Sequence, residues 1–126
     1  MTEIKLGIAG LGTVAQGVLE LIRRNNALMR QRSGVSLRVV RVASRRAKPE
    51  IDLQGAHFST DIEDLLTDPN VDMILELIGG DTTALDLIRR GLAANKPVVT
   101  ANKAILAADG NELMAGRGRQ LLRFEA

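Results

Sequence analysis

A glycine-rich turn near the N-terminus, Gly10-Leu11-Gly12-Thr13-Val14-Ala15, constrains the fold of this chain more than any other feature. It separates an apolar run over residues 4–9 from an amphipathic stretch, so the sequence predicts a strand, a tight turn and a helix. Gly10 allows a sharp turn, and Gly12 allows a ligand to approach the backbone without a Cβ in the way. The N–H groups that open the helix attract an anion. The motif therefore predicts a site for the pyrophosphate of a dinucleotide, formed by Gly10, Leu11, Gly12, Thr13 and Val14. A turn that only connects a strand to a helix is the alternative.

The same alternation continues along the chain. Strands are predicted over residues 4–9, 37–43, 56–59, 71–78, 97–101 and 121–124. Helices are predicted over residues 13–30, 81–94 and 103–114, with a short one that has Thr60 or Asp61 as its N-cap and ends near residue 68. The apolar stripe of the first helix is expected to comprise Val14, Val18, Leu21, Ile22, Leu28 and Met29. The order predicts an α/β fold, a single three-layer domain over residues 1–126 with a Rossmann-type doubly wound parallel sheet.

Composition narrows the partners. The chain has no cysteine, so no disulfide, thiolate metal site or cysteine nucleophile is available, and we expect no metal. It has no signal peptide pattern and no apolar run of 18 residues, so we expect a cytoplasmic protein without a membrane partner. Residues 1–48 carry ten Lys and Arg against two acids, but residues 49–88 carry ten acids and no Lys or Arg. We read Arg23, Arg24, Arg30 and Arg32 as a solvated helix face and expect no nucleic-acid partner.

The end of the second predicted strand bears on the choice of dinucleotide. Enzymes that use NAD place an acid there for the ribose 2′-hydroxyl, whereas an arginine accommodates the 2′-phosphate of NADP. This strand is followed by Ser44, Arg45 and Arg46, and the first acid is Glu50. These residues offer a hydroxyl and two guanidinium groups, so the sequence favours NADP, with NAD as the alternative cofactor. The alternative interpretation is that Arg45 and Arg46 are two solvated arginines of a surface loop.

Three segments resemble the N-terminal cofactor domain of homoserine dehydrogenase. They are the glycine-rich turn continued to Gly17, the segment Glu76-Leu77-Ile78-Gly79-Gly80, and the segment Lys96-Pro97-Val98-Val99-Thr100-Ala101-Asn102-Lys103-Ala104. The resemblance covers the whole chain in order. It implies that the nicotinamide lies near Gly79, Gly80, Thr100, Asn102 and Lys103, with Lys103 as a catalytic residue beside the reacting groups.

Several residues depart from the family pattern or have simpler interpretations. Ala15 replaces the usual third glycine, and the glycine-rich segment 116–119 interrupts a helix that the family normally continues. Asn102 and Thr100 could be only a helix cap and a strand end. Glu76 and the single His57 are expected to be structural.

The resemblance also implies an activity. Family members are oxidoreductases that interconvert aspartate 4-semialdehyde and homoserine in threonine and methionine biosynthesis. The family's substrate and catalytic domain has no counterpart in these 126 residues, so we expect the isolated chain to bind cofactor without turnover. We expect it to be monomeric, and the parent enzyme to be a homodimer. A semialdehyde dehydrogenase is one alternative, but it would need a nucleophilic cysteine, which this chain lacks. A free-standing module that senses NADP(H) is the other alternative.

Overall fold

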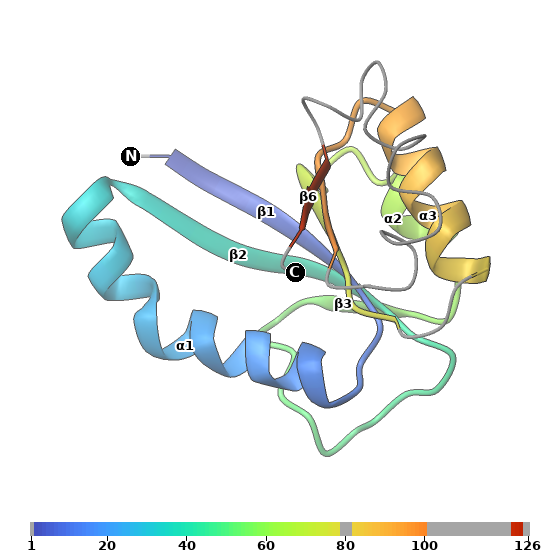
Figure 1. The fold of residues 1–126 in the computed structure, drawn as a ribbon. Coiled ribbons are helices and arrows are strands. Elements are labelled where there is room, and N and C mark those ends of the chain that lie inside the picture. The colour runs from blue at the N-terminus through green and yellow to red at the C-terminus, as the bar shows by residue number, and fades with distance from the viewer. Residues whose placement is uncertain (1, 79–81, 101–121, 125–126) are drawn as a thin grey trace.

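The computed structural model describes residues 2–78, 82–100 and 122–124, with the backbone alone for Thr82 and for residues 122–124. Six parallel strands form one sheet in the order β3-β2-β1-β4-β5-β6 (Figure 1). The strands are β1 (Thr2–Ala9), β2 (Val35–Ala43), β3 (His57–Ser59), β4 (Met73–Glu76), β5 (Val98–Thr100) and β6 (Leu122–Phe124). The helices are α1 (Thr13–Ser33), α2 (Glu63–Thr67) and α3 (Thr82–Ala93). This confirms the predicted doubly wound α/β fold.

Helices cover both faces of the sheet, with α1 on one side and α2 and α3 on the other (Figure 1). Because successive side chains of a strand point to opposite faces, β1 contributes Leu6 and Ile8 to the α1 side and Ala9 to the other. Gly7 lies close to the layer that contains α2, because an added Cβ would come within 2.9 Å of side-chain carbons of Leu65 and Val71. Two apolar cores on a central sheet make the three layers that the sequence predicts.

The predicted stripe of α1 is wrong for three of its six residues. Val14, Leu21 and Leu28 are 56%, 61% and 44% exposed. The helix instead buries Ala15, Leu19 and Ile22, which follow one another at intervals of four and three residues and face β1 and β2. Ala15 is small, so this face of the helix packs closely against the sheet.

Other differences lie at the ends of elements. The structure gives β4 only four residues, although Asp72 N–H and Leu77 N–H still donate to carbonyls of β1, at 2.8 and 2.9 Å. The helix α2 begins at Glu63, with Ile62 in the N-cap position, so the prediction of Thr60 or Asp61 as the N-cap is wrong. The Asp61 carboxylate nevertheless accepts the Glu63 N–H at 2.9 Å, because an Asx turn precedes the first helical turn. The predicted helix over residues 103–114 lies outside the described residues.

The strand order brings the functional edge of the sheet into being. The strand β1 lies between β2 and β4. The helix that follows β1 covers one face of the sheet, and the helix that follows β4 covers the other face. Ligands of doubly wound sheets bind at the carboxyl ends of the strands at this reversal. None of the helices in the described part of the chain is both long and apolar enough to cross a membrane.

Candidate functional site

A cleft of about 390 Å³ opens at the carboxyl edge of the sheet, where β1, β2 and β4 end. Its walls come from five segments that are far apart in the sequence and meet only in the fold. The lining residues are Gly10, Leu11, Gly12, Ala43, Ser44, Arg45, Thr60, Ile62, Leu77, Ile78 and Thr83. Five predicted site residues are therefore brought together, namely Gly10, Leu11, Gly12, Ser44 and Arg45.

The glycine-rich turn has the geometry that an anion site requires. Gly10 has a φ of 102°, which L side chains rarely adopt, and its N–H donates to the Ala43 carbonyl at 2.8 Å. A Cβ on Gly10 would lie 2.7 Å from the Leu77 carbonyl oxygen. Gly12 has ordinary backbone angles, and a Cβ built on it meets no atom within 4 Å. The first glycine is needed by the fold, and the second leaves open space in front of α1.

The start of α1 faces this space without a side-chain cap. Gly12 is the N-cap residue, and no side chain in the described part of the chain caps the first N–H groups of the helix. No acidic residue lies in the first turn either. Thr13 and Val14 are exposed in that turn, beside the cleft but not among its lining residues. Uncapped N–H groups and an open approach are the features of a phosphate site.

The segment after β2 forms the opposite wall. Ser44 is half-buried, and its backbone N–H donates to the Ser59 carbonyl at 3.0 Å, which fixes the exit from the sheet. Arg45 is exposed and lines the cleft, whereas Arg46 is exposed and does not line it. One guanidinium group therefore borders the cleft directly, and a second follows it in the loop.

A lysine that the sequence interpretation did not single out connects these two walls. Lys48 Nζ donates to the Leu11 carbonyl at 3.0 Å, and Gln16 Nε2 donates to the same oxygen at 3.2 Å. The half-buried Lys48 ammonium group thus lies against the glycine-rich turn. An ammonium group has three donors, so two remain beyond this bond. No sequence spacing signals this contact, because it joins residues 37 positions apart.

Four of the missed lining residues had a signal in the sequence. Thr60 and Ile62 follow β3 directly, and Leu77 and Ile78 follow β4. Residues after parallel strands share one edge of the sheet, so their presence in the cleft follows from topology. Thr83, near the start of α3, gave no such indication.

Two buried polar side chains lie at the ends of β4 and β5: Glu76, which is predicted to be structural, and Thr100, which is predicted to lie at the nicotinamide or only to end its strand. Glu76 is 1% exposed and Thr100 is 0% exposed. The Thr100 hydroxyl donates to Glu76 Oε2, and Glu76 Oε1 accepts the Ile78 N–H at 3.1 Å. Glu76 therefore has the structural role expected of it. The predicted site residues Gly79, Gly80, Asn102 and Lys103 lie outside the described residues.

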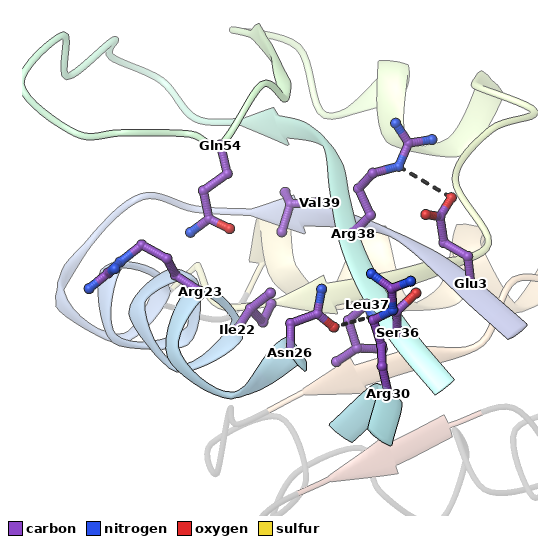
Figure 2. A pocket seen from close by; sticks show the side chains of 10 residues that line it. All are labelled: Glu3, Ile22, Arg23, Asn26, Arg30, Ser36, Leu37, Arg38, Val39 and Gln54. Atoms are coloured by element: carbon purple, nitrogen blue, oxygen red, sulfur yellow. Dashed lines mark hydrogen bonds and ion pairs between the residues drawn. The ribbon is translucent and has the colours of Figure 1, made fainter. Parts of the chain in front are cut away.

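A second pocket, of about 500 Å³, lies between α1 and the first half of β2 (Figure 2). Figure 2 shows two interactions among its lining residues: Asn26 Oδ1 accepts the Leu37 N–H at 2.9 Å, and Arg38 pairs with Glu3 at 3.3 Å. Arg23, also in its wall, pairs with Glu20 at 2.6 Å. The pocket is larger than the cleft, but it lies away from the carboxyl ends of the strands, where doubly wound sheets bind their ligands. The cleft is the better candidate site.

The arrangement defines a class of protein. A parallel sheet in the order 3-2-1-4-5-6, with a glycine-rich turn and an uncapped helix start at the reversal point, is a Rossmann-type dinucleotide-binding domain. The family model described as "Homoserine dehydrogenase, NAD binding domain" matches residues 10–120. The chain belongs to this family, and its cofactor is a nicotinamide dinucleotide.

Relatives agree with this assignment. A homoserine dehydrogenase of Pseudomonas aeruginosa is 40% identical over 128 residues, which cover all of this chain and 30% of the relative. The crystal structure of Staphylococcus aureus homoserine dehydrogenase at pH 6.0 superposes with a TM-score of 0.89 at 28% identity, over 100% of this chain and 33% of that one. The homoserine dehydrogenase structure from Thiobacillus denitrificans has a TM-score of 0.87 at 38% identity, over 98% and 29%. The chain thus spans about a third of the length of these relatives.

Proposed function

We propose that this chain is the NADP(H)-binding domain of a homoserine dehydrogenase that interconverts aspartate 4-semialdehyde and homoserine. The bound nicotinamide supplies hydride transfer to and from the substrate carbon. The residues of this chain hold and orient it. The observation that carries the proposal is the open space in front of Gly12, at the uncapped start of α1 and inside the cleft.

The pyrophosphate fits the glycine-rich turn on steric and electrostatic grounds. Gly12 presents no Cβ to the open space, and the first N–H groups of α1 have no side-chain acceptor. Both conditions favour a diphosphate, which brings oxygen acceptors and negative charge to a helix start. Lys48 adds a cation beside the same turn.

The 2′-phosphate of NADP fits the segment after β2. Arg45 borders the cleft at the strand end where an acid would select NAD, and Arg46 follows it. Guanidinium groups bind phosphate through paired N–H donors, and the Ser44 hydroxyl offers a further donor. We therefore infer that NADP(H) is preferred over NAD(H).

The nicotinamide half is assigned to the ends of β4 and β5. Gly79 and Gly80 follow Ile78, which lines the cleft, and Asn102 and Lys103 follow Thr100, the last residue of β5. In this proposal Lys103 is the catalytic residue of the chain and places positive charge near the substrate carbonyl oxygen, where charge develops during reduction. The remaining catalytic groups belong to the substrate domain of the family.

A pair of glycine substitutions tests cofactor binding without disturbing the fold. Gly12→Ala places a methyl group in the space assigned to the pyrophosphate, and Gly17→Ala places one on α1 where nothing lies within 4 Å either. Calorimetric titration with NADPH is expected to give at least tenfold weaker binding for Gly12→Ala, because a methyl group there excludes phosphate oxygens. Gly17→Ala is expected to bind as the parent does.

Both variants should fold, because Gly17 lies within α1 and the backbone angles of Gly12, with a φ of −83°, are ones that alanine also adopts. Equal NADPH affinity in Gly12→Ala and the parent would contradict the assignment of the pyrophosphate to this turn. Absence of NADPH binding to the parent chain would contradict the proposed function as a whole.

A further inference from the structure

Glu76 is a fully buried carboxylate at the end of an otherwise apolar strand. It is 1% exposed, and its neighbour Ile74 on the same strand is completely buried. A carboxylate in such a place is costly unless hydrogen bonds compensate for the lost water. The Thr100 hydroxyl and the Ile78 N–H each donate to one of its oxygens. None of the ion pairs found among the described residues involves Glu76.

The two hydrogen bonds of Glu76 join a residue that lines the cleft, Ile78, to the last residue of β5, Thr100. Ile78 lines the cleft immediately before Gly79, and Thr100 closes β5 three residues before Lys103. Glu76 and Thr100 are also register partners in the β4–β5 pair. One carboxylate therefore fixes the backbone leaving β4 relative to the end of β5.

We propose that Glu76, together with Thr100, is a positioning pair for the nicotinamide half of the cofactor. This inference rests on the proposed function, because it needs a dinucleotide in the cleft. Glu76 neither contacts the cofactor nor exchanges a proton in this role. It holds the backbone of Ile78 and the end of β5 at Thr100 in fixed relative positions, next in the chain to the residues assigned to the nicotinamide ring and its ribose. The adenosine half, bound near Ser44 and Arg45, does not depend on it.

The test separates the two halves of the ligand. NADPH is compared with 2′-phospho-ADP-ribose, which keeps the adenosine, its 2′-phosphate and the pyrophosphate but lacks the nicotinamide ring. Thr100→Val keeps the shape of the side chain and removes the hydroxyl, and Thr100→Ser keeps the hydroxyl. We expect Thr100→Val to bind NADPH about tenfold more weakly, because binding must then order strand ends that the hydrogen bond holds in place in the parent. Its affinity for 2′-phospho-ADP-ribose should equal that of the parent.

Two further measurements keep the inference falsifiable. The fluorescence of the dihydronicotinamide ring reports its surroundings, and its change on binding should be reduced in Thr100→Val and restored in Thr100→Ser. If Thr100→Val does not fold, the double variant Glu76→Met/Thr100→Val replaces both partners by apolar groups of similar shape, which can be nearly neutral for stability. The double variant should show the same selective loss for NADPH.

Three results are decisive. An equal loss of affinity for both ligands would mean that the pair is only structural, and the inference would be overturned. Unchanged NADPH affinity in Thr100→Val or in the double variant would overturn it as well. Failure of the parent chain to bind either ligand would instead overturn the proposed function on which the inference rests.

Discussion

The Leu77 carbonyl oxygen lies 2.7 Å from the point that a Cβ on Gly10 would occupy. Because the oxygen belongs to the backbone and the backbone also fixes the position of a Cβ, neither atom can rotate away, and the φ of 102° at Gly10 adds strain to any substitution. We expect Gly10→Ala to lower the free energy of unfolding by about 1–3 kcal/mol, the usual cost of a residue held in a disfavoured conformation. Urea unfolding followed by circular dichroism measures this.

Gly12→Ala is the matched control for that prediction, since Gly12 has a φ of −83° and open space around its Cβ position. Its stability should match that of the parent within about 0.5 kcal/mol, as for most exposed substitutions. A Gly10→Ala variant as stable as Gly12→Ala would show that the turn tolerates a side chain, against the geometry described here.

Lys48 gives a second prediction. Lys48→Met keeps the aliphatic stem but removes the ammonium group that bonds the Leu11 carbonyl beside the glycine-rich turn. Affinity for NADPH and NADH should both fall several-fold, about 1 kcal/mol, because the lost charge lies near the pyrophosphate that the two cofactors share. Lys5→Met removes the same charge from a half-buried lysine that does not line the cleft, and it should leave both affinities unchanged. Titration calorimetry distinguishes the two variants.

The acid stability of the domain supplies a third prediction. Two hydrogen bonds hold the pKa of Asp68 below its usual value of 3.8: the Asn70 N–H has the larger effect, and the Arg41 guanidinium has the next largest. A carboxyl whose pKa is lower in the folded state stabilises the fold when ionised. This stabilisation is complete above the unfolded pKa and disappears as the pH falls through the folded pKa.

Asp68→Asn should therefore be less stable than the parent at neutral pH, by roughly 1 kcal/mol. The difference should shrink as the pH falls below 3.8, because the parent then loses the same charge. Urea unfolding of both proteins at a series of pH values measures this difference. A constant difference across the acid range would contradict the assigned cause.

The sequence predicted the sheet and one half of the cleft because both follow from local patterns. The strand, the glycine turn and the helix are adjacent in the chain, so local pattern was enough to predict Gly10 and Gly12 as site residues. Ser44 and Arg45 follow the end of a parallel strand, which places them at the same edge of the sheet. Periodicity predicted the wrong stripe of α1 for three of its six residues, because close packing of Ala15 against the sheet decides which face of the helix is buried. The Lys48 contact and the Glu76–Thr100 bond join distant residues, and no spacing in the sequence indicates them.

Turnover is the subject of a fourth prediction. Homoserine oxidation assayed with NADP and this chain alone should stay at background, since the family's substrate domain supplies the other catalytic groups. Activity that follows the purified chain through chromatography would mean that the described cleft holds both substrate and cofactor. Lys103→Met would then be the variant to compare, with Lys5→Met as its control.

The preference for NADPH over NADH tests the central claim most directly. Calorimetric titration of both cofactors should give about tenfold tighter binding of NADPH, because one good guanidinium–phosphate contact contributes roughly 1.5–3 kcal/mol. The preference should shrink with added salt, since Arg45 and Arg46 are exposed, and it should largely disappear in Arg45→Ala/Arg46→Ala while NADH affinity stays nearly unchanged. Equal affinities for NADPH and NADH in the parent chain would contradict the 2′-phosphate site and return both arginines to the solvated surface.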